Sequence, residues 1–166
     1  MPDNPFADPL AWQPVKAPSG AEMEQIARKV FSRLPENFRG QCEGLVIRVE
    51  EFAPDDVLDD LDIDSELDLL GLFQGVGLPF QSPSAPLQLP NLISLYRCPI
   101  LLYWAEHDET LGAVITHVLV HEIGHHFGLS DEDMERIERE AVETAPRDDH
   151  GRRDHHDDED EEDEED

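Results

Sequence analysis

Basic residues are few in this chain. Twelve lysines and arginines stand against 40 aspartates and glutamates in 166 residues, and the formal net charge is −28. A nucleic-acid backbone or an anionic membrane surface is bound through a basic face, which so acidic a chain lacks. We therefore expect neither a nucleic-acid partner nor a membrane partner. A basic protein is the kind of partner that the charge favours.

Cysteines and long apolar runs are also scarce. The two cysteines, Cys42 and Cys98, are widely separated, and residues 1–20 lack the cationic start and apolar segment of a secretory signal. Isolated cysteines in an untargeted chain are typically reduced thiols. No apolar run approaches the roughly 18 residues that cross a bilayer. We expect a cytoplasmic chain without a membrane span; the sequence does not indicate its oligomeric state.

Proline and acidic residues divide the chain into three parts. Residues 1–18 contain five prolines and predict a flexible, extended arm, which either docks through its aromatic residues or stays loose. Residues 19–145 hold the apolar periodicity and predict one domain, since domains commonly run to about 100–200 residues. Residues 146–166 are almost entirely polar and acidic, and predict a disordered acidic tail.

Apolar periodicity predicts the secondary structure of the domain. Ser19 and Glu22 have the spacing of a capping box, and apolar residues then recur with helical period from Met23 to Leu34. Alternating apolar residues predict two strands, and further helical patterns follow later in the chain. The strands span 45–49 and 91–96, and these helices span about 99–106, 109–127 and 131–142.

The stretch 55–68 is dense in carboxylates. Alternating aspartates from Asp60 to Asp64 fit the start of an EF-hand loop, but the sixth position of such a loop is Ser65 and not glycine. The calcium interpretation therefore fails. We expect two short helices with acidic faces instead, the second of which extends to Phe73.

One stretch has the residue types and spacing of a metal site. His121, Glu122 and His125 form the pattern His-Glu-x-x-His, and a glycine and an aspartate follow at short intervals. On a helix, residues i and i+4 lie on the same face, so His121 and His125 can bind one ion. Glu122 is rotated by about 100° and lies beside that ion, where it can take a proton from metal-bound water.

The third ligand is less closely defined. A catalytic zinc typically has three protein ligands and one position for water. Gly128 suits a left-handed helix cap that turns the chain, and Asp131 follows as the third ligand that we favour. Residues 130–132 also have the composition of a helix start. If Asp131 caps that helix, Glu135 or Glu138 is the alternative third ligand.

The competing interpretation is a buried helix that contains histidines by chance, because His-Glu-x-x-His alone is a modest signal. Here an apolar lead-in, a glycine and an oxygen ligand coincide, which favours a metal site. His117 lies one turn before His121 and on roughly the same face. It is an alternative ligand, a residue that supports the ligands, or a core histidine.

The pattern His-Glu-x-x-His-x-x-Gly-x-x-Asp resembles that of the zincin metallopeptidases. More closely, residues 44–140 are similar to a small bacterial family of zincin-like metallopeptidases. The methionine turn of the metzincins is missing, because Met134 lies only three residues after Asp131. The residues that carry the likeness are Leu92–Tyr96, Arg97–Pro99, Trp104 and His121–Asp131.

The resemblance implies a fold, a cofactor and a set of site residues. The fold would be an α+β, minimal zincin-like domain with a small twisted sheet packed on the active-site helix. The ligands of zinc would be His121, His125 and Asp131, and Glu122 would be the general base. In zincins the strand beside the active-site helix pairs with an extended peptide substrate, which suggests the strand at 91–96 for this role. An ordinary sheet strand is the alternative.

Two functions fit these residues. The first is a zinc-dependent peptidase, in which Glu122 takes a proton from metal-activated water and later delivers it to the leaving amine. Tyr96, Arg97 and Tyr103 are candidates for stabilising the oxyanion. The second is a binding module of the same fold that recognises a basic protein. Glu122 favours the peptidase, because a binding module needs no base beside its metal. Metal storage by the acidic tail is a third interpretation.

Overall fold

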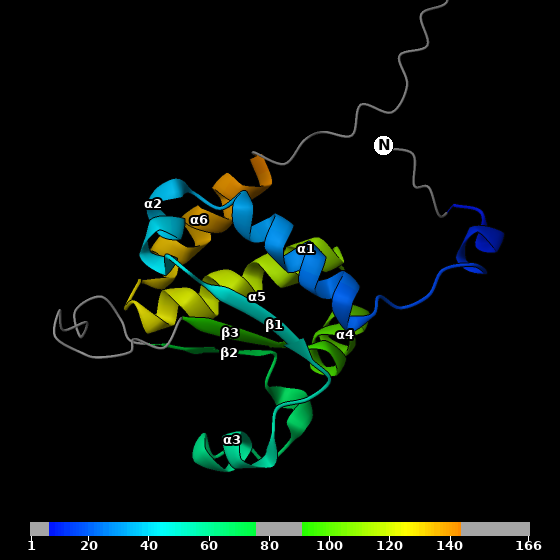
Figure 1. Cartoon of the computed structure of the whole chain (residues 1–166). Helices are drawn as coiled ribbons and strands as arrows, with labels where there is room; N and C mark the ends of the chain where they lie inside the picture. The colour runs from blue at the N-terminus through cyan, green and yellow to red at the C-terminus, as the bar shows by residue number, and fades with distance from the viewer. Residues whose placement is uncertain (1–6, 76–90, 144–166) are drawn as a thin grey trace, which may run out of the picture.

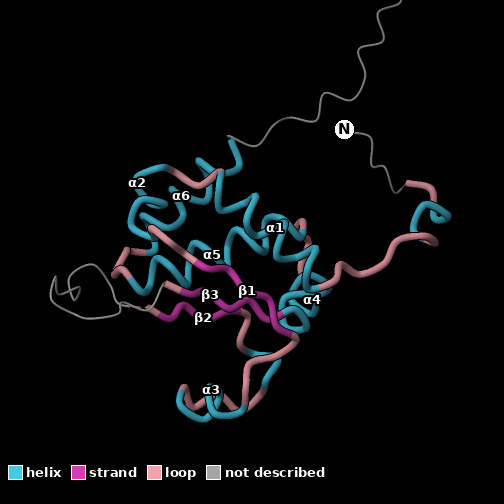
Figure 2. The backbone as a smooth tube through the Cα atoms, viewed as in Figure 1, coloured by secondary structure: helices cyan, strands magenta, loops and turns pink. Residues whose placement is uncertain are grey.

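The computed structural model describes residues 7–75 and 91–143, which form a mixed three-stranded sheet packed against helices (Figure 1). Helices and strands are interleaved along the chain, as the tube in Figure 2 shows. The predicted α+β class, with a small sheet on one long helix, is confirmed. Residues 146–166 lie outside the described residues, so the predicted division of the chain at residues 18 and 146 stays a prediction.

The elements have the following bounds. The helices are α1 (Gly20–Ser32), α2 (Glu36–Arg39), α3 (Asp55–Asp60), α4 (Arg97–Glu106), α5 (Leu111–His126) and α6 (Asp131–Glu143). The strands are β1 (Val46–Glu50), β2 (Gly71–Gln74) and β3 (Leu92–Tyr96), and three short turns of 3-10 helix are η1 (Pro9–Trp12), η2 (Gly40–Cys42) and η3 (Glu66–Asp68). Within the described residues, every helix is too short or too polar to cross a lipid bilayer.

The capping box predicted for the first long helix is confirmed in α1. The hydroxyl of Ser19 accepts a hydrogen bond from the backbone N–H of Glu22 at 3.2 Å, and the Glu22 carboxylate accepts one from the Ser19 N–H at 2.7 Å. Met23 and Ala27, on the apolar face of the helix, are fully buried. This face packs against α5 and β1 (Figure 1).

The sheet has β3 as its central strand. β1 pairs with β3 in parallel, in a register that places Ile47 opposite Ile93, and β2 pairs with β3 antiparallel, with Phe73 opposite Ile93. Both edges of β3 are therefore occupied by other strands. The strand expected to pair with a substrate has no free edge, so it is the ordinary sheet strand of the two alternatives.

The predicted second short helix is reduced to the 3-10 turn η3, and its extension to Phe73 is wrong, because these last residues form β2. Gly71 and Phe73 are buried, and a Cβ on Gly71 would lie 2.9 Å from the Val118 side chain of α5. The missing side chain lets the strand lie close to that helix. The short apolar pattern fits both the period of a helix and that of a strand, and pairing with β3 decides in favour of the strand.

The two faces of the sheet carry different clusters of buried side chains. Ile93 and Leu95 of β3 belong to the main core, which α1, α5 and α6 complete. Tyr96, Ala53 and Leu58 form a smaller cluster, which includes a side chain of α3. The apolar side chains of α5 thus belong to the main core, and its polar side chains, such as His121 and His125, lie at the boundary of that core.

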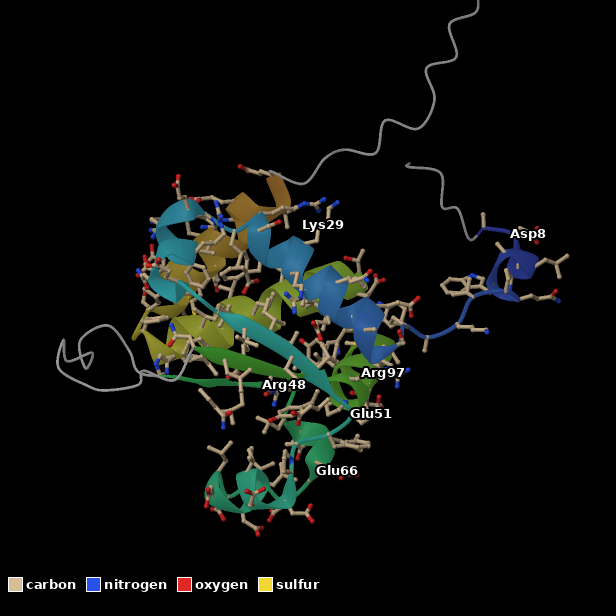
Figure 3. All side chains as sticks on the ribbon, in the orientation of Figure 1. Asp8, Lys29, Arg48, Glu51, Glu66 and Arg97 are labelled. Carbon is tan, nitrogen blue, oxygen red and sulfur yellow. The ribbon has the colours of Figure 1, made fainter. Side chains whose placement is uncertain are left out.

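Residues 7–18 are the part of the predicted arm that the structure describes. Leu10 and Trp12, in the turn η1, are largely exposed, and the turn stands away from the other elements (Figure 1). Arg97 connects the arm to the domain, since its Nε donates a hydrogen bond to the Pro18 carbonyl at 2.7 Å. Its guanidinium also pairs with Glu51 at 3.1 Å (Figure 3).

Candidate metal centre

The helix α5 carries the whole His-Glu-x-x-His pattern in its last turns. It begins at Leu111, after Thr110, whose hydroxyl accepts a hydrogen bond as the N-cap, so the helix starts two residues later than the predicted start at 109. His117, His121 and His125 follow one another at intervals of four residues along one side of the helix. The helix therefore presents two overlapping pairs of histidines, which share His121.

The end of α5 has the predicted left-handed glycine. Gly128 has φ +72°, its N–H donates to the His125 carbonyl at 3.2 Å, and the Leu129 N–H donates to the Gly124 carbonyl at 2.9 Å. These two hydrogen bonds define a Schellman motif. The prediction of this cap is confirmed, and the motif turns the chain directly into α6.

The helix α6 begins with a serine cap. The hydroxyl of Ser130 accepts a hydrogen bond from the Asp133 N–H at 3.2 Å and donates one to the Asp133 carboxylate at 2.9 Å. Asp131 is the first residue of the helix and is exposed. Its carboxylate is therefore not the cap, which was the main competing role for it.

A close contact holds α6 against α5. A Cβ on Gly124 would overlap the sulfur of Met134 and lie 2.8 Å from its Cγ, so only glycine allows this approach without movement of the methionine. Met134 is fully buried, and Ile137 is buried one turn later. The approach brings Glu138 of α6 to the histidine face of α5. From the sequence, Glu138 is one of the alternative ligands, and nothing in the sequence predicts a role for Gly124.

Three metal-ligating side chains meet at this contact. Oε1 of Glu138 lies 2.9 Å from Nε2 of His121 and 3.2 Å from Nδ1 of His117. One ligand atom from each side chain lies within 4.8 Å of the other two. All three side chains are partly exposed, His117 the most at 45%. Two imidazole nitrogens and a carboxylate oxygen match the protein ligands of many catalytic zinc sites.

One atom in this group lacks a hydrogen bond. Oε1 of Glu138 is buried, and no group in the described residues donates a properly directed hydrogen bond to it. The two ring nitrogens lie at ion-pair distance from this oxygen, and the other carboxylate oxygen, Oε2, lies 3.5 Å from Nδ1 of His117. A buried polar atom without a partner is costly in a protein. A cation between the three ligand atoms would satisfy this oxygen, so the donor set fits a divalent metal.

The other expected ligands lie outside this group. The His125 ring is exposed, and its centroid is 5.7 Å from the His121 centroid, against 4.0 Å between His117 and His121. Asp131 is not among the three side chains that meet around His121. Among the described residues, the side chains that lie together are therefore those of His117, His121 and Glu138.

Burial changes the acidity of the groups around the histidines. It raises the pKa of Glu122 to about 7. Burial and the neighbouring His117 lower the pKa of His121, although Glu138 opposes this change. Burial also lowers the pKa of His126, whose ring packs on Phe73 at 4.3 Å and whose Nε2 is buried without a hydrogen-bond partner among the described residues. His126 therefore faces β2 and the edge of the core.

The three candidates for oxyanion stabilisation have other partners. Tyr96 is only 2% exposed, and burial raises its pKa, with smaller contributions from Glu50 and Glu122. Arg97 holds the arm and Glu51, as described above. Tyr103 stacks on His107, with ring centroids 3.8 Å apart. These positions do not single out one of the three for contact with a substrate.

A comparison with protein families agrees with this arrangement. A family model described as zincin-like metallopeptidase matches residues 42–141, which is more than half of the chain. The chain belongs to the zincin-like metallopeptidase family. The match runs from the residues before β1 into α6, so it includes the histidine face of α5 and Glu138. No curated protein matches the chain.

Membership confirms the resemblance expected from the sequence. A metallopeptidase family implies a bound metal ion, usually zinc, and a peptide or protein substrate. The group formed by His117, His121 and Glu138 shows that this chain has side chains able to hold such an ion.

Proposed function

We propose that this protein is a zinc-dependent peptidase that hydrolyses peptide bonds, with Glu122 as the general base. One observation carries the proposal: the helix α5 presents His121 and His125 one turn apart, with the half-buried carboxyl of Glu122 directly after the first of them. Membership of the zincin-like metallopeptidase family supports the same function.

The ligands that we propose for the catalytic ion are His121, His125 and Asp131. The two histidines are separated by one helical turn, which is the spacing that lets two imidazoles bind one ion. Asp131 follows the Schellman turn directly and is exposed, so its side chain can turn toward an ion held by the helix. Zinc, when bound, polarises the scissile carbonyl and lowers the pKa of a coordinated water.

Glu122 performs the proton transfers. It follows His121 in the chain, and the helix directs its carboxylate to the side of the histidine face. The carboxylate takes a proton from the attacking water and later delivers it to the leaving amine. Its partly buried position limits its contact with bulk water, which keeps the proton available for the leaving group.

The strand β2 is the proposed docking edge for an extended substrate. The Tyr96 N–H donates to the Leu70 carbonyl at 2.9 Å. In an antiparallel pair, every second residue exchanges backbone hydrogen bonds with the neighbouring strand, so Leu72 and Gln74 follow Leu70 in bonding to β3. Gly71 and Phe73 therefore direct their backbone groups away from β3. Phe73 also packs on His126 of α5, so this edge lies beside the metal-binding helix. A peptide strand would gain backbone hydrogen bonds here.

The decisive experiment for the base is the variant Glu122→Gln, which keeps the size of the side chain and removes its basicity. We expect zinc content to be unchanged and cleavage of a peptide library to fall by about 10²–10⁴-fold. Glu109→Gln, just before α5, is the matched control and should cleave at the native rate. Cleavage that persists in Glu122→Gln would exclude Glu122 as the base.

Docking on β2 is tested with the peptides that are cleaved. Methylation of alternate backbone nitrogens in the peptide removes the donors needed for strand pairing, and we expect the cleavage rate to fall at least tenfold. Equal rates for methylated and unmethylated peptides would exclude pairing of the substrate backbone with this edge.

A binding module is the second candidate, and the net charge of −28 favours it. Such a protein would hold a basic partner without cutting it. Zinc binding without cleavage of any library peptide, together with capture of polylysine that survives Glu122→Gln, would favour this function over the peptidase.

A further inference from the structure

We propose that His117, His121 and Glu138 form a second cation position on α5, which overlaps the catalytic position by sharing His121. We call it the upstream site, and the set of His121, His125 and Asp131 the downstream site. The upstream site would bind a divalent ion such as Zn²⁺ or Co²⁺ without help from the downstream ligands. This inference goes beyond the proposed peptidase and does not depend on catalysis.

The first argument is the unsatisfied oxygen of Glu138. Oε1 is buried and accepts no hydrogen bond within the described residues, although two imidazole nitrogens lie at 2.9 and 3.2 Å. The carboxylate lies at ion-pair distance from both imidazoles, and its other oxygen, Oε2, lies 3.5 Å from Nδ1 of His117. Its inward position is the one that a shared cation requires.

The second argument is the size of the group. Zinc binds nitrogen and oxygen at about 2.0–2.2 Å, and a tetrahedral site then separates its ligand atoms by roughly 3.3–3.6 Å. The distances from Glu138 to the two histidines, 2.9 and 3.2 Å, are slightly below this range. Small rotations of the side chains, without backbone movement, would fit the group to the ion.

The third argument is that regular elements position the ligands. His117 and His121 lie on consecutive turns of α5, and Glu138 lies on α6, which Met134 and the absence of a side chain at Gly124 hold against α5. Sites built on packed helices keep their geometry better than sites on loops. By contrast, the downstream site depends on Asp131, at the exposed first residue of α6.

The shared histidine makes the two sites mutually exclusive. A neutral imidazole has one nitrogen with a free lone pair, so His121 can bind only one ion at a time. A native chain should therefore hold one ion in this region, at either position. An ion in the upstream site removes His121 from the downstream site. An ion held there would therefore take no part in the proposed peptide hydrolysis.

The test measures Co²⁺ and Zn²⁺ binding by the full chain, in the presence of a chelator that prevents weak binding. The double variant His125→Ala/Asp131→Asn removes the downstream ligands, and both positions are exposed, so the fold should persist. We expect this variant to bind about one Co²⁺, with a visible absorption spectrum of a nitrogen- and oxygen-ligated ion. Adding His117→Ala or Glu138→Gln should weaken binding at least tenfold.

Two controls make the result specific. Glu135→Gln changes the same charge on the exposed side of α6 and should leave the affinity of the double variant unchanged. His121→Ala removes both sites and defines the background from the histidines of the tail. The proposal is overturned if the double variant binds no more metal than His121→Ala, or if Glu138→Gln and Glu135→Gln have equal effects. Neither result depends on peptide cleavage, so failure of the peptidase proposal remains distinguishable.

Discussion

The two histidine pairs of α5 have the same spacing and different surroundings. His117 and His121 face Glu138 of the packed helix α6, whereas the ring of His125 is exposed near the start of that helix. Spacing along a helix thus determines which side chains can share an ion. The neighbouring element determines which carboxylate completes the site, and here it favours the pair that the His-Glu-x-x-His pattern does not contain.

The largest effect is expected from His121→Ala, because His121 belongs to both pairs. This variant should lose specific zinc binding completely, while His107→Ala, at a histidine that stacks on Tyr103, should retain it. Elemental analysis after dialysis against a weak chelator measures the difference. Stoichiometric zinc in His121→Ala would show that neither pair holds the ion.

The next effect concerns the contact that serves the upstream pair. Gly124→Val would force the Met134 side chain away from α5 and should lower the free energy of unfolding by about 1–3 kcal/mol. It should also weaken the upstream site more than the downstream site, because it displaces Glu138. Gly112→Val on the same helix, where a side chain meets open space, is the control for chemical denaturation. Equal losses in both variants would contradict the close contact.

A smaller effect is expected at the turn that serves the downstream pair. Gly128 has φ +72°, and an alanine in this conformation costs about 1–2 kcal/mol of stability. Gly128→Ala should also weaken zinc binding through Asp131, and leave Co²⁺ binding of the upstream pair intact. Gly40→Ala, at a position with no atom within 4 Å of the new Cβ and an ordinary backbone, should be neutral. A neutral Gly128→Ala would exclude the left-handed cap.

The smallest effect is expected in α1, which lies outside both pairs. Hydrogen bonds from Ser19, first the backbone and then the hydroxyl, lower the pKa of Glu22 below 4.5. A carboxyl whose pKa falls on folding stabilises the protein above its ordinary pKa, and loses that contribution as the pH falls through the folded value. Ser19→Ala should therefore reduce the loss of the free energy of unfolding as the pH falls below 4.5, without a change in metal content. An identical acid profile would contradict the capping box.

Local interactions account for what could be predicted about the fold. The capping box at Ser19, the helix around His121 and the left-handed Gly128 all depend on residues within a few positions of one another. Helix propensity, capping and periodicity act over this range. The strand β2 could not be predicted, because its short apolar pattern fits both the helical and the strand period, and its partner β3 is distant in the sequence.

For the site, the sequence alone predicts which helix carries the histidines, the position of Glu122 next to His121 and the turn at Gly128 that follows. The sequence favours Asp131 as the third ligand, with Glu135 or Glu138 as the alternatives. Packing of α6 on Gly124 brings Glu138 to His121 among the described residues and adds His117 to the group, whereas the third ligand of the catalytic ion stays a prediction. The reason is that ligand spacing is a property of one helix, whereas a ligand set that spans two helices depends on how closely their backbones can approach.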